Sequence, residues 1–518
     1  MTASKSLPPR PSLESLRKQA KKLARVQHLT LRNAQLAIAR EYGFAGWPDL
    51  AAEVSKRLGT GLEWAAAQAQ RIIHDNDVER LKQLLSEYPA LLSWRGHDSD
   101  SKGGLLGFAT GAYGDSFDPD RERAFTRAAC AELLIDAGAV VTPLACEGLI
   151  ESRARGLLQL FRRKGVLPHT LTFFSALGDL DAVRGALDET QNDLAKVNDA
   201  LMCACRFEHE EVASVLLERS IALDAELAAH VDGGVGRLAF INALIEARSL
   251  LAFIDTTAAG PWQAFLMRQV VRAIHDGDLT AFVSALQREP WLLGEACVGF
   301  QVGLIERATM RDREAFIAAL LDLEPVLLRR QPPPRSGAIE FALTYAKPHL
   351  IPVLTRIWPM PDDLPHAAGM GNLSRVKQWF DKSSAPALGD VETHLSGISR
   401  QARTDLHWAA PTAQQVLDMA LAFSVINRHF DVADFLLEHG ADINTTWNSH
   451  EPASILHHLV FEDNYDSMRF LIDRGIDMTI TDYRWNSTAH GWALYGKKDQ
   501  KMAQWLEDAQ RQREKGAR

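Results

Sequence analysis

The feature that most constrains this 518-residue chain is a stretch of sequence that occurs twice. Residues 71–93, RIIHDNDVERLKQLLSEYPALLS, align without a gap with residues 272–294, RAIHDGDLTAFVSALQREPWLLG, and nine of the 23 positions are identical. Such self-similarity is the mark of a repeated supersecondary unit, which buries its apolar face only against neighbouring units. The sequence therefore predicts one long array of repeats in place of several separate globular domains.

The C-terminal part of the chain repeats at a shorter spacing. Three similar segments begin at His429, Asn464 and Asp499, so that each lies 35 residues after the one before. Each segment has a short polar turn followed by an amphipathic helix that ends in two large apolar residues. In the first two copies Gly440 and Gly475 follow that apolar pair, where the C-cap of a helix needs a positive φ. Similar apolar pairs occur upstream, and together they predict about twelve helical units.

Several of these segments resemble the ankyrin repeat family, whose unit of about 33 residues has a turn and two antiparallel helices with a TPLHxAA motif. The matching segments are residues 404–410, TDLHWAA, residues 455–457, ILH, and residues 436–444, LLEHGADIN. Residues 364–372, LPHAAGMGN, match more weakly, and residues 140–170 and 220–360 depart from the family pattern. The resemblance implies an all-α fold, an ankyrin-like α-solenoid of stacked helix-turn-helix repeats, several of them degenerate.

The first 58 residues differ from the rest of the chain in charge, because they contain eleven Lys/Arg and only four Asp/Glu. Leu13, Leu16, Ala20 and Leu23 form one apolar stripe, which predicts a helix starting after Ser12. A second helix is expected between Thr30 and Tyr42. This leader resembles a helical segment that precedes ankyrin repeats in many bacterial proteins, which implies a bacterial origin but no activity.

The chain is accordingly predicted to have four parts. They are a basic helical leader or cap at 1–58, degenerate ankyrin-like repeats at 59–380, an insertion or linker at 381–411, and better-conforming repeats with a terminal helix at 412–518.

Composition excludes several classes of protein. No window contains 18 consecutive uncharged apolar residues, and the N-terminus lacks the apolar run of a secretory signal, so the chain is expected to be cytoplasmic with no transmembrane segment. Five cysteines without paired spacing predict buried thiols, with neither a disulfide framework nor a zinc site. The net charge of −9 argues against general nucleic-acid binding.

Motifs of catalysis are absent from the sequence. No nucleophile elbow, HExxH or GxGxxG occurs, and the glycine-rich residues 103–114 lack the lysine of a phosphate-binding loop, so we expect a loop between repeats there. The chain is predicted to be neither an enzyme nor the carrier of a cofactor. In the ankyrin motif the histidine ties one turn to the next by hydrogen bonding, which implies structural roles for His407 and His457. His74 and His275, which are equivalent in the duplicated segments, suit a helix end.

The sequence predicts a partner-binding face at the turns after the two best repeats, because exposed aromatic and arginine residues are common in interface hot spots. The predicted residues are Asn444, Thr446, Trp447, Asn448, His450, Tyr483, Arg484, Trp485 and Asn486. Either tryptophan has a second interpretation, in which it packs between neighbouring turns.

The predicted function is a protein–protein interaction scaffold, whose protein partner the sequence does not identify. Two alternatives remain open at this point. One is an enzyme or effector with a cryptic site in the degenerate middle, at 220–360, which would bring titratable groups together in a polar pocket. The other is a contact of the basic leader with nucleic acid or an anionic membrane. A solvated cap on the first repeat also explains the leader.

Overall fold

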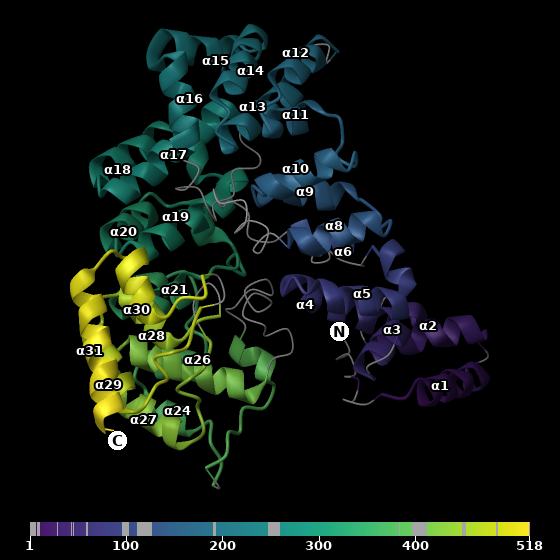
Figure 1. Ribbon diagram of the computed structural model, residues 1–518, viewed down its shortest axis with the longest axis vertical. Coiled ribbons are helices and arrows are strands. Elements are labelled where there is room, and N and C mark those ends of the chain that lie inside the picture. The colour runs from purple at the N-terminus through teal and green to yellow at the C-terminus, as the bar shows by residue number, and fades with distance from the viewer. Residues whose placement is uncertain are drawn as a thin grey trace. The chain divides into compact units, whose positions relative to one another are not determined.

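The chain is all-α. The computed structural model describes residues 7, 11–27, 29–42, 44, 46–58, 61–95, 103–110, 127–189, 193–246, 260–382, 384–395, 412–447, 452–482 and 485–516. Within these residues it is 71% helical, with 29 α-helices and no strand, and Phe380 and Pro386 form one isolated bridge (Figure 1). The predicted fold class is confirmed at this level.

The chain divides into two compact units, residues 1–182 and 183–518. The helices of the first unit are α1 (Leu13–Val26), α2 (Leu31–Glu41), α3 (Trp47–Arg57), α4 (Leu62–His74), α5 (Val78–Glu87), η1 (Pro89–Ser93), α6 (Leu105–Thr110), α8 (Ala128–Asp136), α9 (Pro143–Glu151), α10 (Arg155–Arg163) and α11 (Leu171–Leu177). Helix α12 (Leu180–Glu189) spans the boundary. The predicted boundary after residue 58 lies inside the first unit.

The second unit contains the longer series of helices. Its α-helices are α13 (Leu194–Arg206), α14 (Glu210–Leu223), α15 (Ala225–His230), α16 (Arg237–Glu246), α17 (Pro261–Asp276), α18 (Leu279–Arg288), α19 (Val298–Met310), α20 (Glu314–Asp322), α21 (Ala338–Thr344), α22 (Ile351–Leu354), α23 (Leu364–Gly369), α24 (Leu373–Lys377), α26 (Ala413–Ile426), α27 (Phe430–Glu438), α28 (Ile455–Phe461), α29 (Tyr465–Asp473), α30 (Ala489–Gly491) and α31 (Gln500–Gly516). Shorter helical turns are η3 (Val231–Val235), η4 (Pro290–Leu293), η5 (Glu295–Cys297), η6 (Val326–Arg329), η7 (Pro348–Leu350), η8 (Val391–Leu395) and η9 (Trp492–Gly496).

One tight turn recurs at eleven places in the described residues. A helix ends, one residue takes a positive φ, the next residue caps a new helical segment, and that segment begins at once. In ten of the eleven turns the N–H of the capping residue donates to the carbonyl five residues earlier, which is the bond of a Schellman motif. The residues with positive φ are Asn76, Arg153, Gly178, Glu208, Gly277, Asp312, Ala346, Gly371, Arg428, Asp463 and Lys498.

The duplicated segments have the same local structure. Each consists of an α-helix, the tight turn, a second α-helix and a 3-10 helix, in the order α4, α5, η1 and in the order α17, α18, η4. Asn76 has a φ of 52° and Gly277 a φ of 77° at the turn. The side chains of Asp77 and Asp278 then accept a bond from the backbone N–H three residues later, at 3.1 and 2.9 Å. The two similar stretches of sequence therefore have the same order of helices and the same turn.

The three C-terminal copies also share their turns. Arg428, Asp463 and Lys498, spaced by 35 residues, have φ values of 63°, 53° and 62°, and a helix starts two residues after each. Gly440 and Gly475 close the first two of these helices with φ values of 96° and 92°, as predicted. Helix α26, which precedes the first copy, is buried at every residue from 416 to 426. It packs against α21, α23, α27 and α29.

The predicted leader helices are present in the first unit. Ser12 caps α1 and Thr30 caps α2, and Leu16, Ala20 and Ile38 lie in a small core with Leu50. None of the helices in the described residues is both long and apolar enough to span a membrane.

The interpretation of the glycine-rich residues 103–114 as a loop was wrong in part. Residues 105–110 form α6, whose Leu105, Leu106 and Ala109 are buried, because apolar side chains alternate with the glycines there. Residues 111–114 lie outside the described residues.

Candidate functional site

The turn after α27 contains the first group of predicted partner-binding residues. Asn444 and Thr446 are exposed, as expected. The side-chain oxygen of Asn444 accepts a hydrogen bond from the backbone N–H of Asp477 at 2.7 Å, which connects this turn to the one after α29. The carbonyl of Thr446 accepts a bond from Ala453 at 3.0 Å. Asn448 and His450 lie outside the described residues.

Trp447 does not lie on this surface, which corrects its prediction as an exposed anchor. Its side chain is only 2% exposed and belongs to the core around α26. The indole meets Phe423 edge-on, with ring centroids 5.7 Å apart, and lies 6.2 Å from the ring of His458. Burial of so large an apolar surface outweighs the cost of its Nε1–H, which is buried without a hydrogen-bond partner. Trp447 therefore packs within the fold, against residues of α26 and α28.

The turn after α29 contains the second group. Trp485 is 44% exposed and Asn486 is exposed, while Tyr483 and Arg484 lie outside the described residues. Asp482 organises the turn from its interior, because its buried carboxylate accepts bonds from the backbone N–H groups of Trp485 and Ser487 and from Nε1 of Trp492 at 2.9 Å. The hydrogen bonds of Asp482 therefore fix the backbone of the turn that carries the exposed indole of Trp485.

Trp485 lies in an aromatic surface that the sequence did not predict, made of Phe461, Trp485 and Trp492. Trp492 lies between the other two rings and meets both edge-on, at centroid distances of 5.6 Å from Phe461 and 5.8 Å from Trp485. Phe461, the last residue of α28, is 52% exposed, and Tyr495 on the same turn as Trp492 is 76% exposed. Aromatic side chains that lie this close together are ordinarily buried in the core of a protein. The unit presents a cluster of rings to solvent here.

His457 has the structural role that the ankyrin motif implies. Its Nδ1 lies 2.7 Å from Oγ of Ser454, which caps α28, and its Nε2 lies 3.0 Å from the carbonyl oxygen of Ser487. Burial lowers the pKa of His457, so the ring is neutral and donates to Ser487 through Nε2. The histidine thereby connects the start of α28 to the turn under Trp485. His407 lies outside the described residues.

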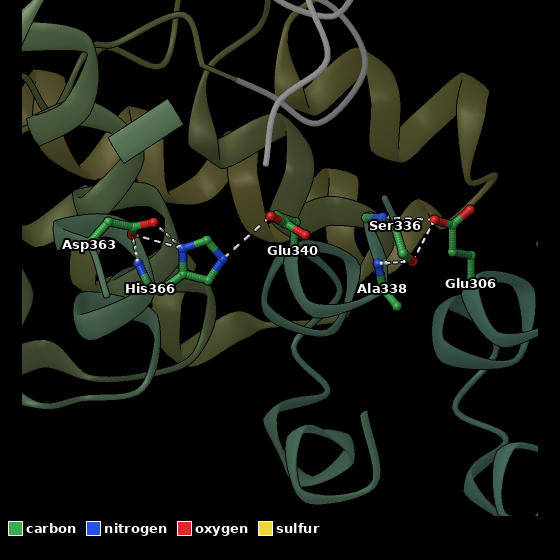
Figure 2. Close-up of polar contacts among 7 residues, drawn as sticks. Glu306, Ser336, Ala338, Glu340, Asp363 and His366 are labelled. Carbon is green, nitrogen blue, oxygen red and sulfur yellow. Dashed lines mark hydrogen bonds and ion pairs between the residues drawn. The ribbon is translucent and has the colours of Figure 1, made fainter. Parts of the chain in front are cut away.

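His366 occupies the same place in its own turn, three residues after the N-cap residue Asp363, but its surroundings are charged. The imidazole is 1% exposed, with Nδ1 2.8 Å from the Asp363 carboxylate and Nε2 3.6 Å from the Glu340 carboxylate (Figure 2). Burial by itself lowers the pKa of His366, but the hydrogen bond to Asp363 and the charge of Glu340 outweigh it and raise the pKa to about 9. The ring is therefore a buried cation between two carboxylates.

Glu306 extends this cluster toward the start of α21. Its carboxylate accepts bonds from the backbone N–H of Gly337 at 2.7 Å and from Oγ of Ser336 at 2.8 Å (Figure 2). Burial raises the pKa of Glu306, and the charge of Glu340 raises it further. Titratable groups do come together at the edge of the segment 220–360, but they cap helices and pair with each other. His366 is protonated at neutral pH, and its ring is held between the carboxylates of Asp363 and Glu340.

The remaining candidate groups are also accounted for by packing. The five cysteines are free and buried, as predicted. Nδ1 of His74, the last residue of α4, lies 3.5 Å from Oδ1 of Asp75. Nδ1 of His275 in α17 lies 3.3 Å from Oδ1 of Asp276. Both histidines therefore have the helix-end position that the sequence predicts. Among the described residues no three His, Cys, Asp or Glu side chains are arranged to hold one metal ion.

Comparison with known proteins adds no family to this description. Neither a scan against protein-family models nor a search of the curated proteins finds a match to the chain. The fold and the site therefore define it as an all-helical protein with an exposed aromatic surface near its C-terminus.

Proposed function

We propose that the chain is a protein-binding scaffold, an ankyrin-like α-solenoid of stacked helix pairs. The observation that carries this proposal is the turn that recurs eleven times in the described residues, because helix pairs joined by one type of turn are the building unit of repeat proteins. The contacts between pairs support it, since α17 contacts α19 and α19 contacts α21. The histidine bonds of His457, which follow the ankyrin pattern, support it further.

The partner binds, in this proposal, at the aromatic surface of Phe461, Trp485 and Trp492. Exposed rings held by a rigid support lose little conformational freedom when a partner covers them, which makes tryptophan a frequent hot-spot residue. Trp485 is held in this way by Asp482 and Trp492. The exposed polar residues Asn444, Thr446 and Asn486 would form the rim of the interface. The scaffold would act in the cytoplasm, where its free thiols are stable.

Affinity capture from a lysate of the native host tests this proposal. The wild type is compared with the double variant Phe461→Ala/Trp485→Ala and with Trp291→Ala, a control that removes another exposed indole of the same unit. We expect a protein that the wild type and the control retain and the double variant loses. The protein is then purified, and its Kd is measured by calorimetry against all three chains.

A loss of affinity of about tenfold or more in the double variant alone would support the aromatic surface as the binding site. Equal affinities for the three chains would remove the aromatic surface from the proposal. If no protein binds any of the chains specifically, the scaffold function itself is contradicted. Circular dichroism of each variant shows that the helices are intact.

A further inference from the structure

The leader has an exposed surface that a solvated cap does not explain. At the junction of α1 and α2 three aliphatic side chains point into solvent, with exposed fractions of 70% for Val26, 36% for Leu29 and 45% for Leu31. Terminal repeats of a solenoid need a polar outer face. The leader core uses other residues, such as Leu16, Ala20 and Ile38, so packing within the first unit does not account for the three aliphatic residues.

Basic residues lie on both sides of Val26, Leu29 and Leu31, which together form the apolar tip of the leader. Helices α1 and α2 contain seven exposed Lys/Arg and two glutamates. Within α1 an ion pair joins Lys18 to Glu14 at 2.8 Å. Arg25 lies in the last turn of α1, Lys22 lies in the turn before it, and Arg32 is the second residue of α2. The seven basic residues are Arg17, Lys18, Lys21, Lys22, Arg25, Arg32 and Arg40.

We propose that the leader docks on an anionic lipid surface, with Val26, Leu29 and Leu31 inserted between headgroups and the cations of α1 and α2 in contact with lipid phosphates. A surface helix that combines a basic face with exposed aliphatic residues matches both layers of a lipid interface, because the headgroups are anionic and the acyl boundary is apolar. The leader is positively charged and the headgroups are negatively charged, and this complementarity is the reason for choosing an anionic lipid surface as the partner. This contact goes beyond the scaffold function and uses a different unit of the chain.

Nucleic acid fits the same charges but not the same apolar residues. Phosphates would attract the cations equally well, but bases bind proteins by stacking on aromatic rings, and exposed aliphatic residues contribute little to this. The aromatic residues of the leader, Tyr42, Phe44 and Trp47, pack against its core. Their rings are therefore part of the fold, and the residues that the structure describes between α1 and α2 add no exposed aromatic ring.

Vesicle flotation with the full chain tests the proposal. Vesicles of phosphatidylserine and phosphatidylcholine are compared with vesicles of phosphatidylcholine alone. We expect binding to the anionic vesicles only, weakened by added salt because the Debye length shortens. The variant Lys21→Gln/Lys22→Gln/Arg25→Gln is expected to lose about a hundredfold in partition coefficient, and Val26→Ser/Leu29→Ser/Leu31→Ser about tenfold.

A matched control separates the leader from charge in general. Arg356→Gln/Arg469→Gln/Lys501→Gln removes three exposed cations from the second unit and is expected to bind as the wild type does. Insertion is read from Val26→Cys carrying a polarity-sensitive fluorophore, whose emission should shift to the blue on anionic vesicles. The label reacts selectively at this position because the five native cysteines are buried.

Four results would overturn the proposal. They are absence of binding to anionic vesicles, equal loss in the control variant, an unshifted fluorophore, and unchanged binding of the serine variant. Retardation of duplex DNA or RNA by the wild type, abolished by the glutamine variant but not by the serine variant, would assign the leader to nucleic acid instead. The folding of each variant is checked by its helical circular dichroism.

Discussion

Asp363 accepts two hydrogen bonds from His366, one from its backbone N–H at 2.9 Å and one from Nδ1 of its ring at 2.8 Å. The first bond caps α23 and the second holds the imidazole as a cation. Glu340, on α21, lies on the other side of the ring (Figure 2). One carboxylate thus starts a helix and stabilises a buried charge, so the stability of the second unit depends on pH.

The first prediction concerns the alkaline side of neutrality. The pKa of His366 is raised to about 9 in the folded chain, above the ordinary value of 6.5, so its stabilisation is complete below pH 6.5 and is lost as the pH rises through 9. The shift corresponds to about 3 kcal/mol at most. Urea unfolding of the wild type should therefore show a falling free energy between pH 6.5 and pH 9.5, and His366→Gln should remove most of this fall. Parallel profiles for the two chains would contradict the charged state of His366.

The second prediction has the opposite sign. Burial lowers the pKa of His457, and its bond to Ser487 needs only the neutral ring, so protonation costs stability. This contribution is present above the unfolded pKa of about 6.5 and is lost as the pH falls. In urea unfolding the wild type should lose more free energy between pH 7 and pH 5 than His457→Gln does. If the variant loses as much as the wild type, His457 does not titrate as its burial requires.

These two histidines show which properties of the site can be predicted from the sequence and which cannot. Both stand three residues after a capping residue, Asp363 or Ser454, and the resemblance to an ankyrin motif predicted a structural role for His457. The charged state of His366 depends in addition on Glu340, which belongs to a helix of another pair. A contact between separate elements has no signal in the local pattern.

The ends of the helices were predicted better than the exposure of individual side chains. The caps at Ser12 and Thr30 and the left-handed Gly440 and Gly475 follow from local rules that each residue type obeys by itself. Left-handed turns at charged residues such as Lys498 were not predicted, because packing of the two helices imposes a φ that the residue does not favour. Whether a tryptophan at a turn is buried depends on distant residues, such as Phe423 against Trp447.

The third prediction compares the two tryptophans of the predicted face. Trp447→Ala should lower the free energy of unfolding by about 3–5 kcal/mol, because it leaves a cavity in the core around α26. Trp485→Ala, at an exposed position, should lower it by about 1 kcal/mol or less. Urea denaturation followed by circular dichroism measures both. Equal effects would mean that the two indoles have similar environments, in contradiction to their burial.

The fourth prediction concerns thiol reactivity. Burial raises the pKa of Cys203 and Cys205 to about 12 and that of Cys146 to about 11, and it also raises the pKa of Cys130 and Cys297. Because the thiolate is the reactive form, a disulfide reagent at pH 8 should titrate almost no thiol in the native chain and five in urea. A thiol of the native chain that reacts as fast as free cysteine would contradict the burial of that residue.

The fifth prediction tests the left-handed closure of the repeated helices with two glycines of the second unit. Gly440 has a φ of 96° and Gly185 lies inside α12, and at both positions an added Cβ would meet no atom within 4 Å. Any effect of alanine therefore comes from the backbone. Gly440→Ala should destabilise the chain by about 1 kcal/mol, because alanine resists a positive φ. Gly185→Ala should stabilise it by about 0.5–1 kcal/mol, because alanine favours a helix. Both are measured from urea midpoints, and a shift of the same sign in the two variants would rule out a left-handed residue at the end of α27.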